Sequence, residues 1–136
     1  MSRHILIDGG QSGCRIVYAT NGERVCTGNG AGLGRHDPDR TEGLLCVLER
    51  AFEDMAPRIP GTVDVVVAGL TGFDGSPETA RAIADGVRTR VRSARVVVTN
   101  DAVTSYLGAI GFEPGAVVAA GTGVIALAGD REGNVA

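Results

Sequence analysis

Three segments of the sequence combine an acid, an amide or a hydroxyl with small residues at the end of an apolar run. They are Asp8-Gly9-Gly10-Gln11-Ser12-Gly13, Thr99-Asn100-Asp101-Ala102 and Ala120-Gly121-Thr122-Gly123. Glycine permits close backbone approach, and free N–H groups with Ser or Thr hydroxyls suit phosphate oxygens. A carboxylate in such a place can hold Mg²⁺ through water or act as a general base. The three segments therefore predict a site for a phosphate-bearing ligand, provided that the fold brings them together.

The hydrophobic pattern predicts the elements that would position these segments. Apolar runs over 4–8, 14–19 and about 23–28 indicate three strands, which we expect to form an antiparallel meander. Asp37-Pro38 is an N-cap acid followed by proline, and it predicts a helix that runs to about Ala56.

Strands and helices alternate after this first helix. Val63–Ala68 is a nearly continuous β-branched run, typical of a central strand covered on both faces, and Val96–Thr99 indicates the next buried strand. Ser76-Pro77 begins a second helix, and a third is predicted from about Ala102 to Ile110. This order predicts an α/β fold over residues 1–113, a mixed five-stranded sheet with helices on both faces.

The last segment, residues 114–136, has the pattern of a β-hairpin that follows an already complete sheet. Its strands are predicted at Gly115–Ala120 and Val124–Ala128. We interpret it as the first hairpin of a second domain whose remainder is missing. An isolated hairpin is marginally stable in water, so it must lean on the first domain or on another molecule. We expect self-association through its open edge, as a homodimer.

Composition excludes several classes of function. The net charge of −3 argues against nucleic-acid and membrane partners, and no apolar run approaches the ~20 residues of a membrane span. All 13 basic residues are arginine, which excludes P-loop NTPases and lysine Schiff-base chemistry. The N-terminus does not have the pattern of a signal peptide. Cys14, Cys26 and Cys46 lack metal-site spacing and favour reduced thiols, so we expect a cytoplasmic protein in which Cys14 and Cys46 are packing groups.

In this order and spacing, the three segments resemble those of the sugar kinase and actin-like ATPase superfamily, whose domains have a ribonuclease H-like fold. Within it, the chain is most similar to the N-acetylglucosamine kinase and BadF/BadG/BcrA/BcrD-type ATPase family. The first glycine turn and Ala120–Gly123 resemble its two phosphate loops, and Ala68-Gly69-Leu70-Thr71-Gly72 also follows its pattern. The resemblance covers essentially the whole chain as an N-terminal domain plus one hairpin, and it implies that the adenosine-binding part lies downstream.

The resemblance implies ATP and Mg²⁺ as cofactors, with specific residues at the nucleotide. Asp8 would organise Mg²⁺-bound water near the γ-phosphate. The residues that would line the phosphates are Gly9, Gly10, Gln11 and Ser12 from the first loop and Gly121, Thr122 and Gly123 from the second.

The resemblance also implies a sugar substrate, with Asp101 as the base that takes the proton of the sugar hydroxyl. Phosphoryl transfer depends mostly on positioning and charge stabilisation, so such a short set of groups suffices. The other residues that would face the sugar are Arg35, His36, Thr71, Gly72, Asp74 and Asn100. The 136 residues alone are expected to be inactive, because half of the interdomain cleft would be absent.

Local chemistry leaves alternatives open for these residues. Asp8 and Thr122 could serve as turn residues, and Asn100 or Asp101 could cap the helix that follows. Gln11 and Val124 depart from the family pattern, which would suit a non-catalytic sugar sensor on the same fold. A further alternative to the sugar kinase is a BadF-type ATPase that activates an electron-transfer enzyme.

Overall fold

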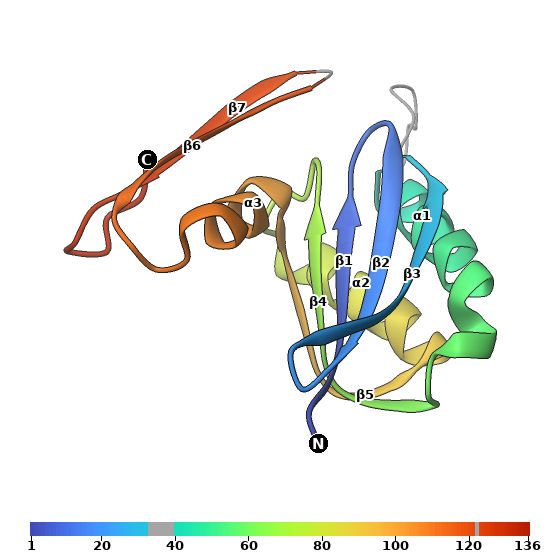
Figure 1. The fold of residues 1–136 in the computed structure, drawn as a ribbon. Helices are drawn as coiled ribbons and strands as arrows, with labels where there is room; N and C mark the ends of the chain where they lie inside the picture. The colour runs from blue at the N-terminus through green and yellow to red at the C-terminus, as the bar shows by residue number, and fades with distance from the viewer. Residues whose placement is uncertain (33–39, 122) are drawn as a thin grey trace.

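The computed structural model describes residues 1–32, 40–121 and 123–136 of the chain. In these residues, a five-stranded sheet with flanking helices is joined to a separate two-stranded hairpin (Figure 1). The elements, in chain order, are β1 (Arg3–Gly9), β2 (Gly13–Thr20), β3 (Glu23–Ala31), α1 (Arg40–Met55), a 3₁₀ turn (Ala56–Arg58), β4 (Thr62–Leu70), α2 (Pro77–Arg90), β5 (Arg92–Asn100), α3 (Asp101–Ile110), β6 (Gly115–Ala120) and β7 (Val124–Gly129).

The large sheet is mixed, with strand order β3-β2-β1-β4-β5. The first three strands pair as the antiparallel meander that the sequence predicts, whereas β1, β4 and β5 run parallel. The fold is the mixed five-stranded α/β fold that the sequence predicts. Its parallel half matters for function, because ligands of such sheets bind beyond the carboxyl ends of the strands.

Two helices begin as the sequence predicts. The hydroxyl of Ser76 accepts a hydrogen bond of 3.1 Å from the N–H of Thr79, and Pro77 occupies the first position of α2. The side chain of Asn100 caps α3 by accepting from the N–H of Ala102 at 2.9 Å. The predicted cap of α1, Asp37, lies outside the described residues.

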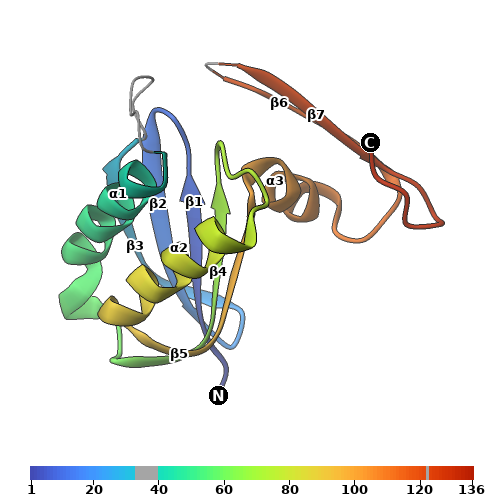
Figure 2. The same cartoon turned by 180° about the vertical axis from the view of Figure 1, so that it is seen from behind.

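Helices α1 and α2 pack side by side on one face of the sheet (Figure 2). Each large apolar side chain buried there stabilises the fold by about 1.5–3 kcal/mol. The buried residues include Ile5, Ile7, Ile16, Val63 and Val66 of the sheet and Leu44, Leu48, Phe52, Ile83 and Val87 of the helices. Arg90 of α2 forms an ion pair with Glu49 of α1.

The opposite face of the sheet is covered only in part, by α3 beside the carboxyl ends of β4 and β5 (Figure 1). Val65 and Val67 of β4 are half-buried, and Leu6 of β1 is 46% exposed. The prediction that β4 is covered on both faces is therefore correct only at its carboxyl end. Val96–Val98 are half-buried as well, because β5 is an edge strand.

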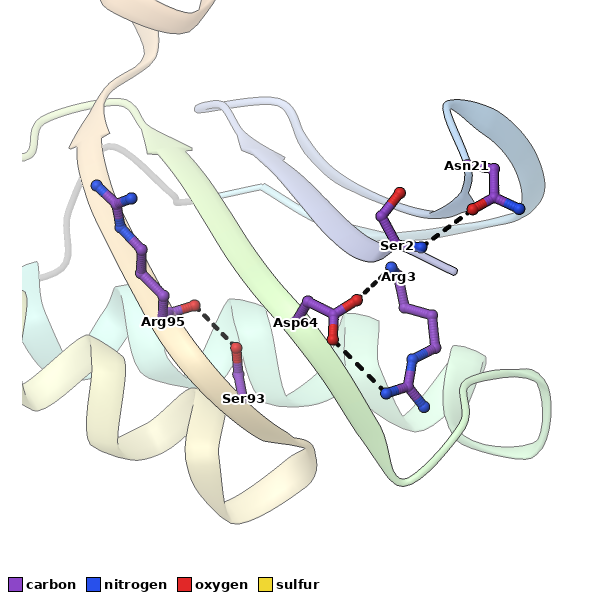
Figure 3. Close-up of polar contacts among 6 residues, drawn as sticks. All are labelled: Ser2, Arg3, Asn21, Asp64, Ser93 and Arg95. Carbon is purple, nitrogen blue, oxygen red and sulfur yellow. Dashed lines mark hydrogen bonds and ion pairs between the residues drawn. The ribbon is translucent and has the colours of Figure 1, made fainter.

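Polar contacts hold the amino-terminal edge of the sheet, far from the segments of chemical interest (Figure 3). A carboxylate oxygen of Asp64 accepts from the N–H of Arg3 at 2.7 Å, and the other lies 3.6 Å from the Arg3 guanidinium. These contacts, the backbone hydrogen bond above all, lower the pKa of Asp64. The N–H of Ser2 donates to the Asn21 side chain at 3.0 Å.

The β6–β7 hairpin packs against α3, as expected because an isolated hairpin is only marginally stable in water. The Tyr106 hydroxyl donates a 2.7 Å hydrogen bond to the carbonyl of Glu113 in the connection between α3 and β6. The hairpin remains exposed elsewhere, with Val118 at 64% and Val124 at 76%. Among the described helices, none is long and apolar enough to cross a membrane.

Cys14 and Cys46 differ in burial and should differ in reactivity. Cys14 is buried in β2, where burial and, to a smaller extent, the charge of Asp8 raise the pKa of its thiol to about 11. Cys46 is exposed on α1, contrary to the prediction that it is a packing group. Because the thiolate is the reactive form, Cys14 should resist thiol reagents at pH 8.

Mass spectrometry after labelling with a thiol reagent tests this difference. In the native protein we expect modification of Cys46 within minutes and of Cys14 only after denaturation. Cys46→Ser should remove the label at position 46 and leave Cys14 unlabelled in the native protein, with the half-buried Cys26 followed on its own peptide. Rapid modification of Cys14 in the native Cys46→Ser protein would contradict the packing of β2.

Candidate active site

The parallel register of the sheet aligns the strand ends that carry the predicted chemistry. Asp8 of β1 lies opposite Gly69 of β4, and Gly69 lies opposite Thr99 of β5. One residue further along, Gly9, Leu70 and Asn100 form the last rung. The first two predicted segments therefore meet at one edge of the sheet, although more than 80 residues separate them in the chain.

The turn between β1 and β2 is closed by a backbone hydrogen bond and leaves two of its N–H groups unbonded within the described residues. The N–H of Gly10 donates to the carbonyl of Gly13 at 2.8 Å, so it is engaged within the turn. Gln11 and Ser12 are exposed at its tip, and within the described part of the chain their N–H groups have no hydrogen-bond partner. This turn can therefore offer two N–H donors and a hydroxyl to an anion.

The backbone of Gly32 lies directly against this turn. A Cβ at position 32 would overlap the Gln11 carbonyl oxygen, the Ser12 carbonyl carbon and the Gly13 nitrogen. Only glycine permits so close an approach of two backbones. Gly32, the residue that follows β3, thus packs against the backbone of the β1–β2 turn.

The segment after β4 is tied to β1 and to α3. The N–H of Thr71 donates to the carbonyl of Gly9 at 2.7 Å, which joins the ends of the two strands. Gly72 has a φ of 72°, a value that favours glycine. The carboxylate of Asp74 accepts from the N–H of Ser76 at 2.8 Å, so it shapes the loop that leads into α2.

The sequence predicts that either Asn100 or Asp101 caps α3, and in the structure Asn100 is the cap, which leaves the Asp101 side chain free of that role. Asn100 caps α3 and donates through its amide nitrogen to the carbonyl of Phe73 at 3.4 Å. The half-buried Asp101 carboxylate has no hydrogen bond or ion pair within the described residues. A carboxylate held at a helix start without a protein partner is available to accept a proton or a ligand hydroxyl.

A cleft of about 290 Å³ brings part of the three predicted segments together. We call it the edge cleft. One wall carries Gln11, Thr71 and Asp101, from the ends of β1, β4 and β5. The other wall is the hairpin, with Ala119, Ala120, Gly121, Gly123, Val124 and Ile125.

Asp8 faces a neighbouring hollow of about 490 Å³ over the uncovered face of the sheet. Arg15 of β2 lies opposite Asp8 in the antiparallel register, and both side chains are exposed and line this hollow. Directly opposed residues project from the same face of a sheet. Arg15 is not among the site residues predicted from sequence, although strand alternation across the short β1–β2 turn could have paired it with Asp8.

Several predicted site residues do not line the edge cleft. Gly9, Gly10 and Ser12 belong to the β1–β2 turn beside it, and Asp74 lies in the loop before α2. Gly72 and Asn100 lie close to it in the chain but are not part of its wall. Arg35, His36 and Thr122 lie outside the described residues.

The donor set at this edge fits Mg²⁺ held through water. Among the described residues, no group of three His, Cys, Asp or Glu side chains could enclose a metal ion. Mg²⁺ does not require such an enclosure, because it keeps several waters and binds through one or two carboxylates together with substrate phosphates. The exposed carboxylate of Asp8 meets this requirement.

Two solved structures have a fold similar to that of this chain, in agreement with the predicted actin-like ATPase fold. The chain is similar to a protein from Chromobacterium violaceum assigned as an N-acetylglucosamine kinase, with 26% identity and a TM-score of 0.69. A second structure with the same assignment, from Porphyromonas gingivalis, shares 17% identity and also has a TM-score of 0.69.

These two alignments cover 100% and 94% of the present chain, but only 48% and 44% of the two structures. The chain therefore spans about half the length of each. No model of a protein family and no curated protein matches the sequence.

Replacing Gly32 by alanine tests the support of the β1–β2 turn. The added Cβ must displace backbone rather than a flexible side chain, so we expect Gly32→Ala to lower the free energy of unfolding by about 1–3 kcal/mol in urea denaturation. Gly61→Ala is the matched control, because a Cβ there meets no atom within 4 Å. Equal stability of the two variants would contradict the described approach of β3 to the turn.

Proposed function

We propose that the chain is the N-terminal lobe of an ATP-dependent sugar kinase, which transfers a phosphoryl group from Mg-ATP to a hydroxyl of a hexose or amino sugar. The observation that carries this proposal is the edge cleft, where a carboxylate without a protein partner faces a glycine turn across a space of small-molecule size. The likeness to the Chromobacterium violaceum structure supports a sugar as the acceptor.

In this proposal, the two turns hold the terminal phosphates of the nucleotide. The N–H groups of Gln11 and Ser12, with the Ser12 hydroxyl, bind phosphate oxygens from the sheet side. The β6–β7 turn approaches from the other wall of the edge cleft. Mg²⁺, held by Asp8 through water, would neutralise charge on the β- and γ-phosphates. Arg15 supplies a further positive charge beside Asp8.

Asp101 acts as the general base. Its carboxylate accepts the proton of the attacking sugar hydroxyl as the new O–P bond forms, while the bond between the γ-phosphorus and the bridging oxygen breaks and ADP leaves. Thr71 lines the edge cleft beside Asp101 and orients the sugar. Positioning of this kind suffices for phosphoryl transfer, which needs little covalent chemistry from the protein.

We further propose that a second lobe, which begins with residues 114–136 and continues beyond Ala136, completes the kinase. The chain spans 48% of the Chromobacterium violaceum protein, which leaves a comparable length for such a lobe. Closure of two lobes excludes water from the reacting groups. Residues 1–136 alone should therefore turn over no sugar.

A coupled ADP-release assay on the full-length natural protein tests the proposed function. The assay uses Mg-ATP with a panel of N-acetylglucosamine, glucosamine, glucose and other hexoses. We expect sugar-dependent ADP release, with kcat reduced about 100-fold or more in Asp101→Asn because a general base contributes 10²–10⁴-fold. Asp85→Asn, the same substitution in an exposed ion pair on α2, is the matched control.

The outcomes separate the proposed function from its alternatives. ATP hydrolysis that no sugar stimulates would contradict the kinase and favour a BadF-type ATPase. Sugar binding without turnover would instead favour a sugar sensor. Equal loss of activity in Asp85→Asn and Asp101→Asn would contradict the role of Asp101.

We also propose that the exposed hairpin pairs residues 1–136 into a homodimer. Val118 and Val124 expose apolar side chains to water. The outer edge of β6 pairs with no other strand, and the outer edge of β7 is paired only at its end, where Ala128 and Gly129 lie beside Val135 and Ala136. Sedimentation velocity should show a concentration-dependent increase in mass, which Val124→Asp should weaken. A strictly monomeric profile across concentration would contradict this pairing.

A further inference from the structure

The position of Asp101 depends on how α3 is seated on the sheet. β5 ends at Asn100 and α3 begins at Asp101, so no loop residue separates the strand from the helix. Any movement of the first turn of α3 therefore moves Asp101. Capping by Asn100 satisfies the N–H of Ala102, but it does not determine how closely the helix approaches β4.

A contact between Thr104 and Gly69 determines that approach. Gly69 is buried in β4, and a Cβ built on it would overlap the Thr104 hydroxyl oxygen. The same Cβ would lie 2.7 Å from Cγ2 and 2.9 Å from Cβ of Thr104. The threonine side chain thus occupies the space that any larger residue at position 69 would fill, and α3 approaches the strand as closely as a glycine allows.

A hydrogen bond transmits this contact to Asp101. The Thr104 hydroxyl donates to the main-chain carbonyl of Asp101 at 3.0 Å, across one turn of α3. A bond of this kind fixes the hydroxyl rotamer and shapes the first turn of the helix. The side chain that rests on Gly69 is therefore bonded directly to the backbone of Asp101.

Gly69 also lies on the rung of the sheet that carries Asp8. The parallel register places Asp8 opposite Gly69, and Asp8 and Thr104 line the same hollow. The contact between Gly69 and Thr104 therefore connects the strand position opposite Asp8 with the helix turn that carries Asp101. The Asn100 side chain makes separate contacts, with the N–H of Ala102 and the carbonyl of Phe73.

We propose that Thr104 and Gly69 are positioning residues, which set the place of the Asp101 carboxylate relative to Asp8. This inference rests on the proposed kinase function and adds a determinant of its rate. Neither residue touches a reacting atom. Their contact acts through Asp101, and displacement of a catalytic group by about 1 Å can cost 10²-fold in rate.

Gly69→Ala in the full-length protein tests the inference. The added methyl group should push α3 away from β4 and lower kcat at least about tenfold, while KM for Mg-ATP changes less than about twofold. Adding Thr104→Ala removes Oγ1 and Cγ2, two of the three Thr104 atoms that the new Cβ would meet. We therefore expect the double variant to regain at least about threefold in kcat over Gly69→Ala alone.

Gly28→Ala is the matched control for overpacking in a strand. Gly28 is buried in β3, where a Cβ would overlap Met55 of α1, away from Asp101. It should lower the melting temperature as Gly69→Ala does, yet leave kcat within about twofold of wild type. A merely structural role for Gly69 would instead give the two variants the same kinetic parameters and no rescue by Thr104→Ala.

Failure of this inference can be told apart from failure of the proposed function. If wild type phosphorylates sugar and folded Gly69→Ala keeps its kcat, only the inference is overturned. If wild type releases no ADP with any sugar, the proposed function fails and the inference fails with it. A nuclear Overhauser effect between the Thr104 methyl and the Gly69 α-protons of residues 1–136 checks the contact itself, and its absence would also overturn the inference.

Discussion

The parallel pairing of β1 with β4 and of β4 with β5 is the constraint on which the candidate site depends. It aligns Asp8, Gly69 and Thr99 on one rung, and it lets β5 deliver Asp101 to the same edge that receives the β1–β2 turn. A shift of one residue in either pairing would turn every side chain of the shifted strand to the other face. The buried positions of β1 and β4, Ile5 and Val66 among them, resist such a shift, so the packing of the core fixes the register of the site.

The candidate site also depends on close approach between elements at the carboxyl edge of the sheet. Gly32 lies against the β1–β2 turn, and Gly69 lies under Thr104. At both places a neighbouring backbone or side chain occupies the volume that a Cβ would need. The site is therefore built from glycines that bring elements together, and a few polar side chains stand at the points where those elements meet.

Much of this fold could be predicted from sequence, because its signals are local. The meander, the Ser76 and Asn100 caps and the hairpin follow from alternation, capping chemistry and glycine turns. The half-burial of β5 could not be predicted, since whether a β-branched strand is central or at an edge depends on sheet order. The pairing of Arg90 with Glu49 depends on the packing of α1 against α2 and leaves no local signal. Arg15 was missed because it contributes to the site through register rather than through a motif.

The proposed kinase reaction requires that the edge cleft receive the terminal phosphates of a nucleotide together with a sugar hydroxyl. A crystal structure of the full-length protein with N-acetylglucosamine and a non-hydrolysable Mg-ATP analogue tests it most directly. We expect a γ-phosphate between the Gln11–Ser12 turn and the β6–β7 turn, with a sugar hydroxyl about 2.6–3.2 Å from the Asp101 carboxylate. Phosphates bound elsewhere, or an Asp101 that faces no sugar hydroxyl, would contradict it.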